Sequence, residues 1–427
     1  MAVASVGVKV EIREEYDVVI VGGGTAGVFA ADAAARAGAR TLLVEKNGML
    51  GGTITSAYIN HPGIFNYWGR QLITGPCFEL LLRVEKAGGL KMPRNDSEPK
   101  SPFSQQIRVD SFLMAVEMER LCRESGVQLL MHTMLSYAQQ TKDGIDLLLT
   151  CKEGLRAVRA KKAIDCTGDA NLAGMLGYEK VRSEHLQPAT YANRIDGYDI
   201  EAIDEHQVNA AFENAIDRGY LDKTAFSWKK PYKMLKQKRI DMHIPCRGAE
   251  TSVEKTEMEL SAHETLARML EVFRGVKGCE NIKVTTFAAE CGIRETCRIV
   301  GEQTMTAEKY LSGYVYDDAI CFAFYPIDVH TADGIRNIHF DHGVVATVPY
   351  RAMIPKGSAH ILVAGRTASS DSDTNSAVRV QAPCMAMGTA AGVAAALAAA
   401  GNVSVENVNR NELVEELKKI GATVPEK

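Results

Sequence analysis

A strand, a glycine-rich turn and a helix follow one another near the start of the chain, and this order constrains the fold more than any other feature. Residues 17–21 form a short apolar run that predicts a strand buried on both faces. The turn at residues 22–27 reads G-x-G-x-x-G, and the alanine-rich residues 26–37 predict the helix. Residues 41–44 predict a second strand, which ends at Glu45. This β-turn-α-β unit is typical of a dinucleotide-binding fold.

The glycine positions have a physical explanation in such a unit. Gly22 permits the tight turn, Gly24 lets the backbone approach a pyrophosphate, and Gly27 lets the helix pack closely on the strand. Thr25 and Ala26 lie in the first turn of the helix, whose free N–H groups and positive dipole end attract phosphates. We therefore predict that these five residues bind a dinucleotide.

The residue at the end of the second strand narrows the choice of dinucleotide. Glu45 lies 18 residues after Gly27, where a carboxylate accepts hydrogen bonds from both ribose hydroxyls. An acid at this place disfavours a 2′-phosphate. The expected ligand is therefore FAD or NAD rather than NADP.

The loop after Glu45 resembles that of the glutathione-reductase-type FAD-binding proteins. Lys46 leads to a second glycine pair, Gly51 and Gly52, which Thr53 follows. In that superfamily the Gly-Gly loop runs past the flavin. The sequence shows no second G-x-G-x-x-G between a strand and a helix, so no separate NAD(P)H domain is expected. The resemblance therefore favours FAD over NAD.

Later segments extend this resemblance. One predicted strand ends in a T-G-D motif, another ends in A-G-R, and the resemblance implies that both touch FAD. These motif residues are Thr167, Gly168, Asp169, Gly365 and Arg366. The resemblance also places the N-terminus of a helix that begins near Pro383 at the flavin pyrimidine, with Gly388 packed against the sheet or the cofactor.

Together these motifs resemble those of the FAD-dependent oxidoreductase family. This family is related in fold to the flavoproteins of succinate dehydrogenase and fumarate reductase, and to the flavoprotein of heterodisulfide reductase. The resemblance covers residues 16–60, 106–180 and 285–400, whereas residues 190–285 carry no recognisable motif. The iron–sulfur cysteine motifs of heterodisulfide reductase are absent, so electron bifurcation is not expected.

The motif positions predict an α/β protein with a discontinuous main domain. We expect a Rossmann-like FAD-binding domain with a three-layer, mostly parallel sheet, and an inserted α+β substrate or cap domain. Amphipathic patterns predict helices at residues 107–123, 200–218 and 252–274. The expected boundaries are an N-terminal extension at 1–15, the FAD-binding domain at 16–75, 106–190 and 340–427, a loop-rich connection at 76–105 with an exposed loop at 94–102, and the cap domain at 191–339.

One pair of candidate catalytic residues lies in a predicted strand. Asp328 and His330 are two residues apart, so their side chains point to the same face. An aspartate beside an imidazole fixes its tautomer and raises its basicity. His330 is therefore our first candidate for an acid or base, and a hydrogen-bonded structural histidine is the alternative.

Arg294 and Arg298 form the second candidate pair. On a helix their spacing of four would place both on one face, where they would clamp a carboxylate or stabilise an anionic flavin. The alternative is that Glu295 and Glu302 pair with them.

The loop after the Gly-Gly turn supplies the third candidates. Tyr58 and His61 lie in this loop, close enough in sequence to the Gly-Gly pair for either to face the flavin. His339 and His342 suggest a metal site only weakly, because in a strand they would face opposite sides. We therefore expect no metal.

Composition excludes several other classes of function. With 49 basic and 53 acidic residues the net charge is −4, which argues against nucleic acid as the partner. The ten cysteines show no zinc spacing and indicate a reducing cytoplasm. No signal peptide is visible, and the alanine-rich residues 386–400 are too short to cross a membrane.

These observations predict an enzyme in which the substrate exchanges a hydride directly with FAD. The expected chemistry is dehydrogenation of a small polar organic molecule at a C–OH, C–N or CH–CH position, or the reverse reduction. A flavin-binding protein that passes electrons to a partner redox protein, as an electron-transfer subunit, remains the alternative. The sequence leaves the oligomeric state open, with a homo-oligomer among the options.

Overall fold

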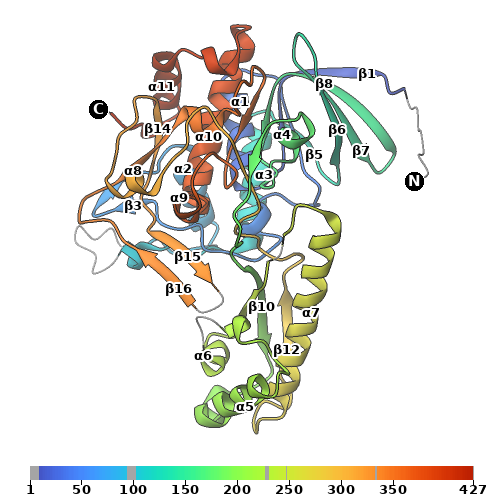
Figure 1. The fold of residues 1–427 in the computed structure, drawn as a ribbon, viewed down its shortest axis with the longest axis vertical. Coiled ribbons are helices and arrows are strands. Elements are labelled where there is room, and N and C mark those ends of the chain that lie inside the picture. Colours follow the sequence, from blue (N-terminus) through green and yellow to red (C-terminus); the bar gives the residue numbers. More distant parts are fainter. Residues whose placement is uncertain (1–8, 94–101, 227–229, 247, 332–333, 427) are drawn as a thin grey trace.

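The structure is a computed structural model that describes residues 9–93, 102–226, 230–246, 248–331 and 334–426. It is an α/β protein with two lobes, an upper one built on a Rossmann-like sheet and a lower one that contains α5, α6, α7, β10 and β12 (Figure 1). Most of the expected N-terminal extension and residues 94–101 of the expected exposed loop lie outside the described residues.

The central sheet of the upper lobe has seven strands in the order β5-β2-β1-β8-β7-β6, with β18 also paired to β8. Its strands are β1 (Ile12–Val21), β2 (Thr41–Val44), β5 (Gln128–Leu130), β6 (Met134–Gln140), β7 (Ile145–Cys151), β8 (Gly154–Asp165) and β18 (Ile361–Val363). Five of them run parallel, and β7 and β6 extend the sheet antiparallel to β8. The carboxyl ends of the parallel strands meet at one edge, where ligands bind in such sheets.

The first strand is longer than the sequence predicted. β1 begins at Ile12 rather than at residue 17, because the preceding residues pair with β8 from Ala157 onward. Exposure alternates along the added residues, whereas residues 18–21 are buried on both faces as expected. The long hairpin of β7 and β8 supplies the partner backbone that the local sequence could not reveal.

Helices α1 (Thr25–Arg36) and α10 (Gln381–Ala400) cover one face of this sheet. Glycines of α10 allow the two helices to approach closely. A Cβ atom on Gly388 would lie 2.1 Å from the carbonyl oxygen of Ala26, and one on Gly392 would lie 2.2 Å from that of Ala30. α10 therefore packs its backbone directly on α1.

The connection expected to be loop-rich contains a helix. α2 (Pro76–Lys86) begins with a proline in its first turn, where the missing N–H costs nothing. Most of its apolar side chains recur with helical spacing and are buried, whereas Leu82 is exposed. α3 (Ser111–Glu124) starts after residue 107 because Asp110 caps it by accepting a hydrogen bond from the backbone N–H of Leu113.

The remaining elements of the upper lobe are short. The helices are α4 (Asn171–Met175), α8 (Ala307–Leu311), α9 (Ser372–Val378) and α11 (Arg410–Lys419). The strands are β3 (Asn66–Tyr67), β4 (Arg70–Gln71), β9 (Lys180–Val181), β13 (Arg298–Ile299), β14 (Ala319–Ala323), β15 (Ile327–Thr331), β16 (Gly334–Ile338) and β17 (Ala346–Pro349).

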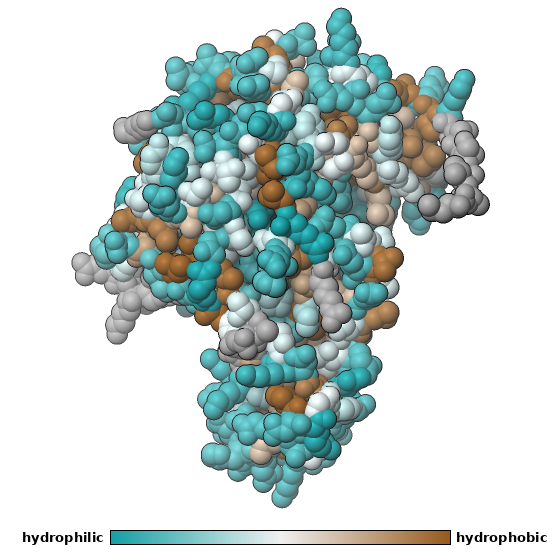
Figure 2. Space-filling view, viewed as in Figure 1, coloured by the Kyte–Doolittle hydropathy of each residue, from teal (hydrophilic) through white to brown (hydrophobic). Residues whose placement is uncertain are grey.

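The lower lobe has its own core around an antiparallel sheet in the order β11-β10-β12. Its strands are β10 (Ala189–Asp196), β11 (Arg239–Ile244) and β12 (Lys283–Phe287), and its helices are α5 (Glu205–Asp217), α6 (Pro231–Lys236) and α7 (Ser252–Arg274). A capping box formed by Thr251 and Glu254 starts α7. The surface of this lobe is mostly hydrophilic on the face drawn in Figure 2.

The core of the lower lobe is smaller than the expected cap domain. Its buried members extend from Ala189 to Ile293, whereas Met305 and later apolar residues belong to the core of the upper lobe. The reason is that β14 pairs with β17 and packs against α10. The chain therefore returns to the upper lobe before the expected boundary at residue 339.

Helix α10 is also long and apolar enough to cross a membrane, by length and composition alone. The sequence predicts a continuous apolar run only at residues 386–400, which is too short for a span. The helix is longer because it begins at Gln381, and 89% of its apolar window is buried inside the protein. This burial is what a core helix shows.

A glycine-to-alanine exchange tests the contact between the two helices. Gly392→Ala places a methyl group against the backbone of α1, so we expect the free energy of unfolding to fall by about 1–3 kcal/mol. The matched control is Gly275→Ala, whose Cβ would lie an ordinary 3.4 Å from its nearest neighbour. Urea denaturation of both variants measures the difference. Equal stability of the two would contradict the close packing.

Candidate active site

One cavity of about 920 Å³ connects the glycine-rich turn to the boundary between the lobes. Its lining begins at the carboxyl ends of β1, β2 and β8 and continues to β11, β15 and the start of α10. We call the part lined by Asp328 and His330 the inner chamber. The cavity is within the range that small-molecule and cofactor sites occupy.

The turn at the outer end has the geometry that a pyrophosphate site needs. Gly22 has φ of +102°, and a Cβ on it would lie 2.5 Å from the carbonyl oxygen of Cys166. A Cβ on Gly27 would lie 1.8 Å from the carbonyl oxygen of Gly22, so only glycine lets α1 approach β1 this closely. A Cβ on Gly24 would meet nothing nearer than Gly52 Cα at 4.0 Å, and Gly24 lines the cavity. Its open side is therefore available to a ligand.

Glu45 lies in the cavity wall beside this turn. Its side chain is already held, because Oε2 accepts from the Gly23 N–H at 2.7 Å and Oε1 from the Asn47 N–H at 2.8 Å. Burial raises the pKa of the carboxyl group. The two backbone N–H groups fix the carboxylate in an orientation that leaves lone pairs for ribose hydroxyls.

Lys46 contacts the lower lobe. Its Nζ lies 2.8 Å from Glu290 Oε2, which also binds Lys255 of α7 at 2.6 Å. Burial opposes ionisation of Glu290, yet the two lysines lower its pKa to about 2. This ion triad ties the end of β2 to the lower lobe at the rim of the cavity.

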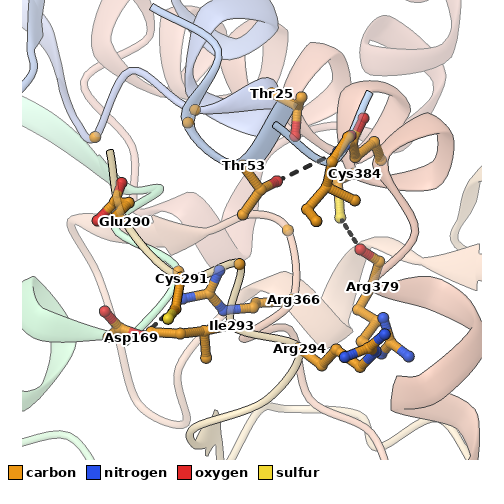
Figure 3. A pocket seen from close by; sticks show the side chains of 18 of the residues that line it. Thr25, Thr53, Asp169, Glu290, Cys291, Ile293, Arg294, Arg366, Arg379 and Cys384 are labelled. Carbon is orange, nitrogen blue, oxygen red and sulfur yellow. Dashed lines mark hydrogen bonds and ion pairs between the residues drawn. The ribbon is translucent and has the colours of Figure 1, made fainter. Parts of the chain in front are cut away.

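The T-G-D motif at residues 167–169 and the A-G-R motif at residues 364–366 contact each other in the cavity wall. Arg366 Nη2 lies 2.7 Å from Asp169 Oδ1, and its guanidinium stands over Gly168, where a Cβ would lie 2.7 Å from Cζ. Thr167 Oγ1 donates to Asp165 at 2.7 Å, which holds the end of β8 in place. Figure 3 shows Arg366 beside Asp169, with Thr53 on the far side of the pocket.

Most of the residues expected to bind the cofactor line this cavity. They are Gly22, Gly24, Thr25, Ala26, Glu45, Lys46, Gly52, Thr53, Thr167, Gly168, Asp169, Gly365 and Arg366. Gly27, Gly51 and Gly388 do not line it. Gly27 and Gly388 instead allow close packing on β1 and α1, and the Gly51 N–H donates to the carbonyl of Gly23 at 2.8 Å. The expectation that Gly388 touches the cofactor is therefore corrected to a packing role.

The inner chamber contains the Asp328–His330 pair. His330 Nε2 lies 3.0 Å from Asp328 Oδ2, and the two side chains are 10% and 16% exposed. Burial lowers the pKa of His330 to about 4 although Asp328 raises it, so the ring is neutral at pH 7. Burial raises the pKa of Asp328, but the hydrogen bond from His330 and nearby arginines bring it below its usual value. The pair is therefore a neutral imidazole that donates from Nε2 to an aspartate, which leaves Nδ1 as the acceptor.

A second histidine lies against the first. The rings of His243 and His330 are 5.0 Å apart at 71°, and Arg294 Nη2 lies 3.3 Å from His243 Nε2. Burial lowers the pKa of His243 to about 2, with Arg294 and His330 adding to the effect. Two neutral histidines therefore stand side by side in the protein at pH 7.

The predicted arginine pair is not on a helix. Residues 294–297 are irregular, with a bend at Thr296, and Arg298 begins β13, so the two side chains have different partners. Arg294 lines the cavity, whereas Arg298 is buried, binds Glu295 at 2.6 Å and donates to the Ser370 carbonyl at 2.9 Å. Arg298 is therefore a structural residue, and the alternative that Glu295 pairs with it is confirmed. Glu302 instead accepts from the Gly357 N–H at 2.7 Å.

The two loop candidates differ in position. His61 lines the cavity, but Tyr58 does not. Tyr58 has φ of +59° and packs against the core of the lower lobe, with the guanidinium of Arg194 5.6 Å from its ring centre. Its carbonyl accepts from Arg239 at 3.2 Å. Tyr58 therefore joins the lobes rather than facing the cavity.

Several cavity residues were missed by sequence reasoning. β11 reads R-I-D-M-H-I, so Arg239, Asp241 and His243 share one face while the apolar residues between them enter the core of the lower lobe. This alternation of polar and apolar residues is visible in the sequence of residues 190–285, where no motif was recognised, and could have indicated the strand. Arg379 and Gln381 lie at the junction of α9 and α10. The sequence alone assigned no role to either residue.

Five buried polar atoms of the described cavity-lining residues have no hydrogen-bond partner. Burial without a hydrogen bond is costly, so such atoms indicate a missing ligand or water. Among the cavity-lining residues, the unpartnered atoms are Thr190 Oγ1, His330 Nδ1, Arg366 Nε, Arg379 Nε and Gln381 Oε1. With the open side of Gly24 and the position of Glu45, the residues present fit a dinucleotide cofactor at the outer end and a polar ligand in the inner chamber.

Comparison with known proteins agrees with this fit. Residues 17–417 match the family model described as FAD dependent oxidoreductase. A solved geranylgeranyl bacteriochlorophyll reductase-like protein from Thermoplasma acidophilum is similar at 13% identity and a TM-score of 0.49, over 95% of this chain and 83% of that one. The p-nitrophenol 4-monooxygenase PnpA from Pseudomonas putida DLL-E4 is similar at 12% identity and a TM-score of 0.44, over 94% and 84%. The family match confirms the resemblance drawn from the motifs and FAD as the cofactor.

Substitution of Gly24 tests the cofactor end. The Cβ of Gly24→Val would lie in the open cavity, 4.0 Å from its nearest protein neighbour, so we expect FAD affinity to fall while the apoprotein keeps its stability. Glu45→Ala removes an acceptor for the ribose, and we expect affinity to fall by roughly tenfold to a thousandfold. Fluorescence titration with FAD measures the affinity of both variants, and Gly275→Val is the control. Unchanged affinity in both variants would place the cofactor elsewhere.

Proposed function

Because this chain belongs to the FAD-dependent oxidoreductase family, we propose that it dehydrogenates a small polar organic molecule, or reduces it in the reverse direction, in the inner chamber. The observation that carries this proposal is the buried Asp328–His330 pair, whose Nδ1 atom has no partner. The family match supports an FAD-dependent enzyme, and the inner chamber supports direct reaction with a small molecule.

The outer part of the cavity would hold FAD. Gly22 and Gly24 would bind the pyrophosphate, Glu45 the ribose, and Thr53 and Arg366 the part nearer the inner chamber. When bound, FAD supplies the acceptor for the electron pair and hydrogen that leave the substrate carbon. The protein supplies orientation, exclusion of water and the proton acceptor.

His330 would take the second hydrogen as a proton. A substrate O–H or N–H would donate to Nδ1, because Nε2 already donates to Asp328. Asp328 fixes this tautomer and stabilises the imidazolium that forms. In the reverse direction the imidazolium returns the proton. Low exposure of both side chains keeps water from competing for Nδ1.

We also propose a reducing compartment, the cytoplasm, for this enzyme. All ten cysteines are free, and only Cys246 is not fully buried. Disulfides are rare in such a compartment, and buried thiols act there as small apolar side chains.

Loss of the imidazole tests the proposal. We expect His330→Ala to slow reduction of the bound flavin by substrate at least about a hundredfold, since a general base contributes about 10²- to 10⁴-fold. Asp328→Asn should slow it less, because the ring remains. Stopped-flow absorbance at the flavin band measures the rate, and the flavin spectrum before mixing controls for cofactor loading. A wild-type rate in His330→Ala, together with a lower melting temperature, would make the histidine structural.

The pH dependence provides a second measurement. The lowered pKa keeps His330 neutral above about pH 4, so the rate of flavin reduction should stay level between pH 6 and 8 and fall as pH approaches 4. An inflection near 6.5, the ordinary histidine pKa, would contradict a buried base. If no small metabolite reduces the flavin whereas a partner redox protein does, the alternative of an electron-transfer subunit replaces this proposal.

A further inference from the structure

We propose that the substrate is a small carboxylic acid whose carboxylate binds Arg379 and Arg294. This inference rests on the proposed function and names the class of substrate for the same chamber. It follows from the positions and partners of the two arginines, which only the folded chain brings together.

The two arginines lie together in the wall of the cavity. Figure 3 shows their guanidinium groups close to each other, on the opposite side of the pocket from Glu290. Arg379 comes from the end of α9 and Arg294 from the irregular segment after Gly292. Two like charges at one place in a buried wall require negative charge nearby.

Arg379 lacks a full set of partners. Its side chain is 12% exposed, and Nη2 donates to Gln187 Oε1 and to the Asp328 carbonyl, both at 3.2 Å. Its Nε is buried without a partner. The nearest Asp328 carboxylate oxygen lies 4.0 Å away and already accepts from His330.

Arg294 forms hydrogen bonds to uncharged groups. Nη1 donates to the Pro188 carbonyl at 2.5 Å, and Nη2 meets the ring of His243. Burial lowers the pKa of Arg294 to about 9, and Arg379 adds to the effect. Burial likewise lowers the pKa of Arg379. Both guanidinium groups are thus under-neutralised in the described structure.

Among the described residues, the two arginines and Asp328 together leave one excess positive charge. The two arginines contribute two positive charges and Asp328 contributes one negative charge, while the low pKa values of His330 and His243 keep both rings neutral. Burial raises the pKa of Tyr325, so this neighbour is also neutral at pH 7. Glu295 favours the charged form of Arg379 from a distance, but its carboxylate is already paired with Arg298.

The other nearby charges of the described residues leave the excess positive. Arg239 pairs with Asp241 on the same face of β11, and its Nη1 also donates to Asn60 at 2.9 Å. The lining residue Arg108 adds positive charge rather than removing it, and burial lowers its pKa. The chamber therefore needs a negative ligand.

The excess positive charge requires an anion, and the geometry favours a carboxylate. The unpartnered Nε of Arg379 belongs to a planar donor group whose shape matches a planar carboxylate. Because Arg379 and His330 share Asp328, a bound carboxylate would hold the neighbouring carbon of the substrate beside the imidazole.

Binding to the oxidised holoenzyme tests this inference without turnover. The probes are acetate, propionate and lactate, each paired with its amide, and inorganic phosphate; perturbation of the flavin absorbance reports binding. We expect each acid to bind at least tenfold more tightly than its amide and than phosphate. Equal binding of acid and amide, or tighter binding of phosphate, would overturn the carboxylate assignment.

Substitutions of Arg379 test whether this arginine binds the carboxylate. Arg379→Gln should weaken propionate at least tenfold while the protein keeps FAD, and Arg379→Lys should retain part of the affinity because it keeps the charge. Arg120→Gln, an exposed arginine on α3, is the matched control and should bind propionate like the wild type. If Arg379→Gln loses FAD but an FAD-saturated sample binds propionate normally, the arginine serves the cofactor and the inference fails.

Failure of this inference and failure of the proposed function give different results. If the acids do not bind but a neutral metabolite reduces the flavin in a His330-dependent manner, only the substrate class is wrong. If the acids bind at Arg379 but no small molecule reduces the flavin, the anion site stands and the proposed function fails.

Discussion

The close approach of helix α1 to strand β1 is the constraint on which the rest of the structure depends. It is possible only because Gly27 presents no Cβ to the carbonyl oxygen of Gly22, which would lie 1.8 Å away. This contact sets the N-terminus of α1 at the edge of the sheet and leaves Gly24 facing open space. In the same way, the missing Cβ of Gly392 lets α10 pack closely on α1. The start of α10 is thereby fixed at the inner end of the same cavity.

The lower lobe completes the site through a simple strand pattern. Alternation along β11 sends its apolar side chains into the core of that lobe and its polar ones toward the upper lobe. Arg239 then bonds to the Asn60 side chain, and His243 packs against His330. The cavity therefore joins an outer end built for a dinucleotide to a buried inner chamber with neutral histidines and excess positive charge. Both ends would be needed for the direct reaction that we propose between FAD and a small molecule.

The sequence predicted the parts whose chemistry depends on local spacing. The turn from Gly22 to Gly27, the acid at Glu45 and the alternation of Asp328 and His330 all have the expected local geometry. Contacts between distant segments could not be predicted. Arg294 and Arg298 have different partners because their segment is irregular rather than helical. The partners of Arg379 come from residues 187 and 328, and only the folded chain brings these together. The extension of β1 to Ile12 likewise depends on a hairpin more than a hundred residues away in sequence.

A crystal structure of the protein with FAD and propionate tests the central claim most directly. We predict the FAD ribose at Glu45, the pyrophosphate over Gly24, and the flavin ring between the turn and the inner chamber. The propionate carboxylate should lie on Arg379, with its carbon atoms beside His330. A flavin ring directed away from the inner chamber, or a chamber whose arginines contact no carboxylate while FAD is bound, would contradict this prediction.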